Sequence, residues 1–139
     1  MPTDEADPAA AAAKHEQQLQ DFFQGQPGEF PALDIVLLGM GDDGHTASLF
    51  PHTTALAVGN RLVTVGNKDG QPRITFTVPF INQARCVLFL VTGANKQEAL
   101  AHVFADDDDA QQYPSRLIQP QGEMIWLLDQ NAGATLNSN

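Results

Sequence analysis

The sequence has little cysteine and few basic residues. Its single cysteine, Cys86, excludes an internal disulfide and favours a reducing, cytoplasmic compartment. Lys and Arg number 7 against 17 Asp and Glu, which gives a formal net charge of −10. Nucleic acids and anionic membranes are bound through basic surfaces, so this composition argues against both as partners.

Long hydrophobic runs are also missing from the sequence. Every apolar run is much shorter than the roughly 20 residues that a membrane-spanning helix needs, so we expect no membrane segment. Residues 1–5 are acidic in character and no apolar stretch follows them, which argues against a signal peptide. The 42% apolar content at this length predicts one globular domain over residues 1–139.

Three short apolar runs carry the main signal of secondary structure. They span residues 33–38, 87–91 and 124–128, and turn residues bound them. Such runs are typical of parallel strands that are covered on both faces. Segments 61–65 and 73–77 are rich in β-branched residues and are further candidate strands.

Helical patterns lie between these strands. Residues 7–24 predict a helix, with Asp7 as its cap and Pro8 at its first position. Shorter helices are expected from about His45 to Pro51, over 96–104 and over 131–136. The alternation predicts an α/β fold, with an open, mostly parallel sheet flanked by helices.

Two loops that directly follow strands are the candidate ligand-binding segments, because ligands bind beyond the carboxyl ends of open parallel sheets. They are residues 39–46 and residues 92–96. The first carries Gly39, Gly41 and Gly44, and glycine lets the backbone approach a ligand closely. The spacing of these glycines differs from that in dinucleotide-binding and P-loop motifs, which argues against a nucleotide site.

Asp43 and His45 are the candidate catalytic pair in the first loop. Their spacing would let the carboxylate orient the imidazole, which could then take a proton from water. Backbone N–H groups beside them could hold a developing oxyanion. The same residues also suit a plain glycine turn that caps a helix. Residue chemistry alone does not favour the catalytic pair over the capping turn.

Other polar segments have simpler interpretations. Lys96 is expected to be a solvated lysine, although a ligand could compensate a cation at a helix start. The run Asp106–Asp109 is expected to be a solvated loop rather than a metal site. Cys86 lies in an apolar run, which favours a buried small side chain over a nucleophile.

The segment from Leu33 to Pro51 resembles the signature of the 6-phosphogluconolactonase family, and it reads LDIVLLGMGDDGHTASLFP. Later segments agree with the family in the same order: RITFT at 73–77, TGANK at 92–96, and WLLD at 126–129 followed by Ala132. The alanine-rich first helix also resembles the family's. The resemblance covers nearly all of the chain and implies the sugar-phosphate isomerase-like fold.

The resemblance implies hydrolysis of 6-phosphoglucono-1,5-lactone to 6-phosphogluconate, in the oxidative pentose phosphate pathway. It gives His45 the role of general base for water, and Asp43 would place His45 or the sugar. No metal or organic cofactor is expected, because a lactone is an activated ester that one base and electrostatic stabilisation can open.

The resemblance also implies which residues bind the substrate. Gly39, Gly41 and Gly44 would shape the loop, whose N–H groups would steady the oxyanion. Arg73 and Lys96 would face the phosphorylated lactone, with Lys96 the better candidate for its phosphate.

The sequence departs from the family pattern in two respects. Asp42 stands where the family usually has proline, and neither the family's Gly-Gly-Ser-Thr-Pro phosphate loop nor its Asp-Glu-Arg motif is present. We therefore expect a sheet without the N-terminal strands and an incomplete phosphate site. The sheet edge exposed in this way would favour pairing with another chain.

Two alternative functions remain open at this stage. One is a glucosamine-6-phosphate deaminase-like isomerase, whose family has a glutamate five residues after the loop histidine. Phe50 occupies that position here, which makes this alternative the weaker one. The other is a non-catalytic remnant, or a half-domain that acts only together with a separate N-terminal segment.

Overall fold

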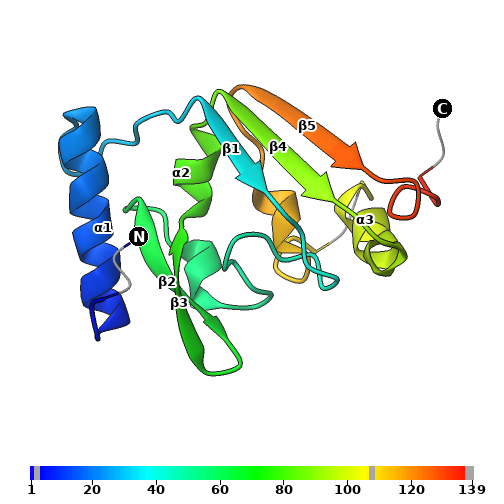
Figure 1. Ribbon diagram of the computed structural model, residues 1–139, viewed down its shortest axis with the longest axis horizontal. Helices are drawn as coiled ribbons and strands as arrows, with labels where there is room; N and C mark the ends of the chain where they lie inside the picture. The colour runs from blue at the N-terminus through cyan, green and yellow to red at the C-terminus, as the bar shows by residue number, and fades with distance from the viewer. Residues whose placement is uncertain (2–3, 107–108, 137–139) are drawn as a thin grey trace.

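The computed structural model describes residues 1, 4–106 and 109–136, and Figure 1 shows its elements. The strands are β1 (Ile35–Leu38), β2 (Val63–Lys68), β3 (Gln71–Phe76), β4 (Cys86–Val91) and β5 (Glu123–Leu128). The helices are α1 (Pro8–Phe23), α2 (Val78–Asn82) and α3 (Gln97–Val103), with 3-10 turns η1 (Thr54–Ala57), η2 (Ala94–Lys96) and η3 (Pro114–Leu117).

The main sheet contains three parallel strands in the order β1-β4-β5. Leu37 of β1 pairs with Leu88 of β4, which in turn pairs with Ile125 of β5. This arrangement confirms the predicted α/β fold with a parallel sheet. All three apolar runs form these strands, within one or two residues of the expected bounds.

The other two strands form a separate antiparallel hairpin, β2–β3. Its turn consists of Asp69 and Gly70, which both have positive φ, at 52° and 84°. An Asp-Gly pair is among the strongest signals for a two-residue hairpin turn. The strands lie closer to this turn than the predicted segments 61–65 and 73–77, and residues 61, 62 and 77 lie outside them.

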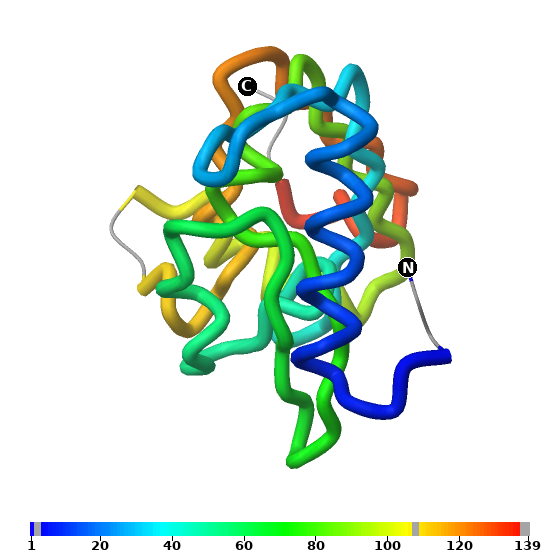
Figure 2. Tube along the Cα trace, turned by 90° about the vertical axis from the view of Figure 1, so that its left-hand side faces the viewer, coloured from blue at the N-terminus to red at the C-terminus, as the bar shows by residue number. Residues whose placement is uncertain are grey.

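Helix α1 packs across this hairpin, as Figure 2 shows from the side. The carboxylate of Asp7 accepts hydrogen bonds of 3.2 Å from the N–H groups of Ala9 and Ala10, which confirms the predicted cap. Ala12 of the helix is buried against Val63 of β2 and Phe80 of α2. The neighbouring Ile81 belongs to the core beneath the main sheet, so α2 links the two cores.

The two faces of the main sheet differ in their exposure. One face packs on the core, and Figure 1 shows α2 and α3 below it. The opposite face carries apolar side chains that are exposed: Ile35 at 67%, Leu37 at 65%, Leu90 at 52%, Leu127 at 48% and Ile125 at 36%. The prediction of strands covered on both faces is thus wrong within the described residues, where helices cover one face.

Two predicted helices are turns in the structure. Between His45 and Pro51 the chain forms an isolated bridge from Thr46 to Leu49, and Ala47 has a φ of 49°, which a right-handed helix does not allow. Residues 131–136 form turns with hydrogen bonds such as Gly133 N–H to the Asp129 carbonyl. The helix predictions for residues 45–51 and 131–136 are therefore wrong.

Two further observations concern expectations from composition. No α-helix among the residues described here is both long and apolar enough to cross a membrane. Cys86, which was expected to be buried, is partly exposed at the start of β4.

Neighbouring residues of β4 provide a test of this two-faced sheet. Phe89 is fully buried and stacks on Trp126 at 4.0 Å between ring centroids, whereas Leu90 is 52% exposed. We expect Phe89→Ala to lower the free energy of unfolding by about 3–5 kcal/mol. Leu90→Ala serves as the matched control and should cost less than about 1 kcal/mol. Urea unfolding measures both values, and equal losses would contradict the exposure of this face.

Candidate active site

The loop after β1 is closed by its own hydrogen bonds. The Thr46 hydroxyl donates to the Gly39 carbonyl at 2.8 Å, and the Gly41 N–H donates to the His45 carbonyl at 2.8 Å. The Gly44 N–H donates to the Gly41 carbonyl at 3.1 Å. These bonds fix the loop directly beyond the carboxyl end of the strand, where open parallel sheets bind ligands.

Within this loop, His45 and Asp43 are hydrogen-bonded to each other. One carboxylate oxygen of Asp43 lies 2.5 Å from His45 Nδ1 and accepts the His45 backbone N–H at 3.0 Å. An ionised carboxylate only accepts hydrogen bonds, so we assign the ring proton to Nδ1. Nε2 then carries a lone pair that can take a proton, and the side chain of His45 is 23% exposed.

The contacts of Asp43 also shift its own pKa. Partial burial acts to raise this pKa, but the backbone N–H of His45, the hydrogen bond from its ring and the attraction between the two groups outweigh burial. The net result is a pKa below the ordinary value of 3.8 for this carboxyl group. Asp43 is therefore ionised at neutral pH and remains an acceptor for the imidazole.

Two neighbours enclose the His45 ring. A side chain on Gly41 would collide with His45 Nδ1, so this position must stay without a Cβ for the ring to lie where it does. On another side lies Phe50, which is 5% exposed and whose ring centroid is 4.5 Å from that of His45. The ring borders a cavity of about 350 Å³ lined by Gly39, Met40, Gly41, His45 and Ala47.

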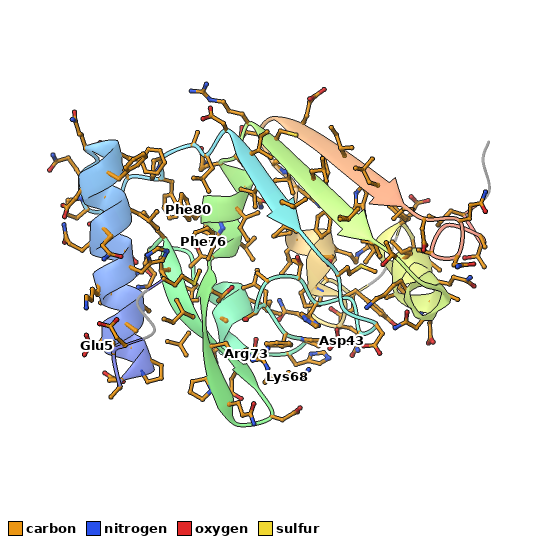
Figure 3. The ribbon with its side chains drawn as sticks, viewed as in Figure 1. Glu5, Asp43, Lys68, Arg73, Phe76 and Phe80 are labelled. Atoms are coloured by element: carbon orange, nitrogen blue, oxygen red, sulfur yellow. The ribbon has the colours of Figure 1, made fainter. Side chains whose placement is uncertain are left out.

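The β2–β3 hairpin packs directly on this loop. A Cβ on Gly66 would collide with the carbonyl oxygen of Ser48, and the Ser48 N–H donates to the Thr75 hydroxyl at 3.1 Å. The close approach brings Lys68 and Arg73 to the loop, with Lys68 Nζ 5.8 Å and Arg73 Cζ 6.0 Å from the Phe50 ring centroid. Figure 3 shows Lys68, Arg73 and Asp43 in the same part of the molecule.

A second cavity lies between the hairpin tip and the loop. Its volume is about 350 Å³, and its lining includes Asp43, Phe50, Asn67, Lys68 and Asp69. Asp43 thus borders this cavity, while its partner His45 borders the first one.

The loop after β4 is held by Asp129. Its carboxylate accepts the N–H of Ala132 at 2.7 Å and that of Gly93 at 3.0 Å, and these bonds lower its pKa. Lys96 lies at the end of η2 and is half-buried. Its N–H donates to the Gly93 carbonyl at 3.2 Å, and its side chain has no hydrogen bond or ion pair among the described residues. Because β1 and β4 are parallel neighbours, the loops that follow them leave the sheet at the same end.

The structure brings some of the predicted site residues together and separates others. Asp43, His45 and Gly41 are in contact, and Gly39 lines the same cavity as His45. Gly44 has another role: its φ is 79°, and its carbonyl accepts hydrogen bonds from Ser115 in η3. No contact joins Lys96 to His45 among the interactions of the described residues.

Sequence reasoning did not identify three residues that shape this site: Phe50, Lys68 and Asp129. Lys68 had a usable signal, because the Asp-Gly turn fixes the register of the hairpin and places Lys68 and Arg73 on one face. For Phe50 and Asp129, the contacts arise from packing between distant segments.

The residues that could bind a metal ion are dispersed. No group of three or more His, Cys, Asp and Glu side chains could hold a metal ion in the part of the chain that the structure describes. Asp107 and Asp108 of the acidic run lie outside the described residues.

Comparison with known proteins gives consistent matches. The family model described as glucosamine-6-phosphate isomerases/6-phosphogluconolactonase matches residues 1–126. A 6-phosphogluconolactonase of Synechocystis is 66% identical over 98% of this chain and 57% of its own length, and one of Nostoc is 68% identical over 99% and 57%. A solved 6-phosphogluconolactonase from Trypanosoma cruzi superposes with a TM-score of 0.82 at 32% identity, covering 94% of this chain and 53% of that one. The chain therefore spans little more than half the length of these relatives.

Two glycines of the loop allow a matched test of the His45 position. A Cβ on Gly41 would occupy the space of the His45 ring, whereas a Cβ on Gly39 meets nothing within 4 Å. We expect Gly41→Ala to displace the imidazole and Gly39→Ala to leave it in place. NMR spectra of the His45 ring check this, and identical ring signals in both variants would contradict the packing.

The lowered pKa of Asp43 predicts how stability depends on pH. Because the folded pKa lies below the unfolded one, the contribution of the carboxylate is complete above the unfolded pKa and is lost as pH falls through the folded one. The stability difference between the wild type and Asp43→Asn should be constant near pH 7 and should shrink only below about pH 4. Denaturant unfolding at several pH values measures it, and a difference that shrinks between pH 7 and pH 5 would refute the assignment.

Proposed function

Because this chain belongs to the glucosamine-6-phosphate isomerase/6-phosphogluconolactonase family, we propose that it hydrolyses 6-phosphoglucono-1,5-lactone to 6-phosphogluconate. This reaction belongs to the oxidative pentose phosphate pathway. The observation that carries the proposal is the Asp43–His45 pair, whose imidazole borders a cavity at the carboxyl end of a parallel strand. A positioned base beside a cavity is the minimum that hydrolysis of an activated ester requires.

In the proposed reaction, His45 Nε2 takes a proton from water while the water oxygen attacks the lactone carbonyl carbon. The tetrahedral intermediate then collapses, the bond between this carbon and the ring oxygen breaks, and the proton passes from Nε2 to the ring oxygen. The carboxylic acid that forms loses its proton at neutral pH. Asp43 holds the ring through Nδ1 and stabilises the imidazolium between these two proton transfers.

The oxyanion of the intermediate would be steadied by backbone N–H groups of the loop. Those of Gly41, Gly44 and His45 already donate within the loop. Gly41 and Gly44 therefore shape the loop. The donors to the oxyanion would be other N–H groups along the cavity, whose lining includes Met40 and Ala47.

The proposed surroundings follow from composition and from the chemistry of the site. We place the chain in the cytoplasm, because its single cysteine suits a reducing compartment. Its ligand is the small phosphorylated lactone, and the charge of −10 disfavours nucleic acid and anionic membranes as partners. The proposed chemistry needs neither a metal ion nor an organic cofactor.

The exposed apolar face of the main sheet favours a second candidate function, that of a half-domain. Parallel sheets are normally covered on both faces, and here Ile35, Leu37 and Leu90 are exposed on one of them. In this alternative, the chain becomes active only when a separate N-terminal polypeptide of the family covers that face. That another chain pairs with β1, an edge strand of the main sheet, also stays a prediction.

A comparison of histidine variants tests the proposed base. We expect His45→Ala to lower lactone hydrolysis by roughly 10²–10⁴-fold, because the reaction loses its positioned base. His15→Ala is the matched control, since His15 lies on α1 and stacks on Phe76. The rate above spontaneous hydrolysis is measured with both purified variants.

The outcomes of this assay separate the two candidate functions. Equal turnover in His45→Ala and in the wild type would refute the role of His45. A wild-type chain that is folded but inactive, and that gains activity when the N-terminal part of a relative is added, would support the half-domain.

A further inference from the structure

The loop after β1 is joined to a distant part of the chain at Gly44. The Gly44 carbonyl accepts two hydrogen bonds from Ser115 of η3, one from its backbone N–H at 2.9 Å and one from its hydroxyl at 2.8 Å. Ser115 is fully buried and follows Gly44 by 71 residues in the sequence. A carbonyl oxygen has two lone pairs, so the two donors of Ser115 occupy both of them.

The Gly44 carbonyl belongs to the same peptide unit as the backbone N–H of His45. A peptide unit is planar, so an interaction that fixes its C=O also fixes the direction of its N–H. The His45 N–H donates at 3.0 Å to the Asp43 oxygen that also bonds to His45 Nδ1. Ser115 and Asp43 therefore hold the two ends of one peptide unit, directly before the Cα atom of His45.

Glycine at position 44 makes this peptide unit easy to rotate. Its φ is 79°, and a Cβ there would lie 2.9 Å from Cδ1 of Tyr113, so the position favours glycine on both grounds. Glycine also has more backbone conformations available than other residues. A rotation of the following peptide unit would turn the His45 N–H away from Asp43, and the two bonds from Ser115 oppose it.

η3, which carries Ser115, is itself bonded to two helices. The Asn82 side chain, at the end of α2, donates to the Leu117 carbonyl at 2.9 Å. The Arg116 guanidinium donates at 2.6 Å to the carbonyl of His102, in the last turn of α3. Ser115 therefore ties the loop to both helices that pack below the main sheet.

We propose that Ser115 is a positioning residue for His45, because it holds the Gly44–His45 peptide unit in the orientation that brings the imidazole to Asp43. The inference rests on the proposed function, in which His45 is the base. The cavity that His45 borders is lined by residues of its own loop, and Ser115 acts on it through Gly44. The predicted effect of Ser115 is therefore on the orientation of the base and not on substrate binding.

The proton on His45 Nδ1 reports on this orientation. A proton that an ionised carboxylate accepts lies in a strong hydrogen bond, so its NMR signal lies at low field. The chain has four histidines, and loss of the signal in His45→Ala assigns it. Ser115→Ala removes the hydroxyl and keeps the backbone N–H bond. We expect it to shift the signal to higher field and to speed its exchange with water, and an unchanged signal would overturn the proposal.

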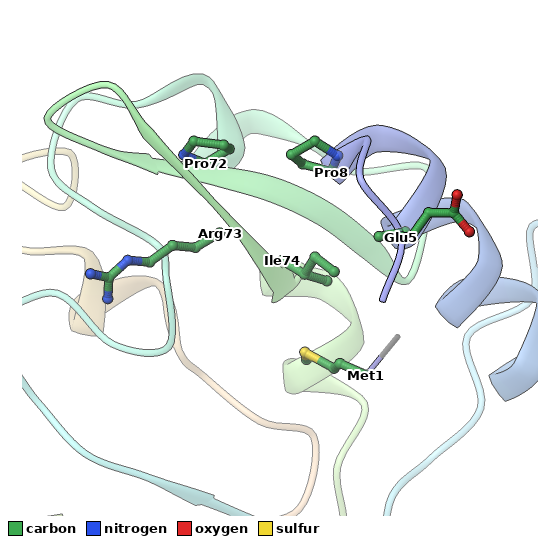
Figure 4. A pocket seen from close by; sticks show the side chains of 7 residues that line it. Met1, Glu5, Pro8, Pro72, Arg73 and Ile74 are labelled. Atoms are coloured by element: carbon green, nitrogen blue, oxygen red, sulfur yellow. The ribbon is translucent and has the colours of Figure 1, made fainter. Parts of the chain in front are cut away.

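Thr77→Val is the matched control for the loss of a buried hydroxyl donor. The Thr77 hydroxyl donates to the Arg61 carbonyl at 2.8 Å, and Thr77 is fully buried like Ser115. Thr77 caps α2 beside Phe80, in the core that Ile74 also contacts, and Figure 4 shows Ile74 in the cavity between the hairpin and the N-terminal residues. The control should leave the imidazole signal unchanged. Equal changes in both variants would show a general loss of packing and would overturn the role of Ser115.

Turnover provides a second measurement. We expect Ser115→Ala to lower kcat for lactone hydrolysis by roughly 10-fold to 100-fold, because a misplaced base loses its alignment with the attacking water. KM should stay within about twofold of the wild-type value, because the cavity lining is intact. A raised KM at unchanged kcat would overturn the proposal.

The hydrolase proposal can fail separately. A wild-type chain that does not hydrolyse the lactone, but whose imidazole signal shifts in Ser115→Ala and not in Thr77→Val, would retain the positioning role and refute the proposed activity. A chain that hydrolyses the lactone equally well in Ser115→Ala and wild type would retain the activity and refute the positioning role.

Discussion

The hydrogen bond between Asp43 and His45 is the constraint on which the other features of the site depend. It is possible because Gly41 leaves room for the imidazole and because its N–H closes the loop on the His45 carbonyl. It also decides which ring nitrogen remains available to a ligand. The cavities, Phe50 and the hairpin all surround a ring whose orientation this bond has already determined.

Local sequence patterns predicted the parts of this arrangement that depend on neighbouring residues. The cap of α1 by Asp7 and the strands at 35–38 and 86–91 follow from residue type and hydrophobic pattern. The contact between Asp43 and His45 also follows from their separation by one residue. The spacing of these residues therefore permits a carboxylate beside an imidazole at the end of a strand, although it left a plain capping turn equally open.

The remaining features depend on packing between segments that are far apart in the sequence. The approach of Gly66 to Ser48 determines where Lys68 lies, and no local pattern indicates it. The sequence predicted a short helix from about His45 to Pro51, but Ala47 has a positive φ and the chain forms a bridge from Thr46 to Leu49 instead. Likewise, a continuous apolar strand does not reveal whether a layer covers each of its faces, and Leu37 is exposed although its pattern suggests burial.

The distribution of charge has a consequence for how an anion would reach this loop. At long range the chain, with a net charge of −10, would repel an incoming phosphate, whereas close to Phe50 the cations Lys68 and Arg73 would attract it. Dissolved ions reduce both effects, because the Debye length falls to about 10 Å at 0.1 M ionic strength. For such an anion, added salt would first speed the encounter and then weaken the final contact. Binding would then be fastest at an intermediate ionic strength, unlike in a protein whose overall field attracts its ligand.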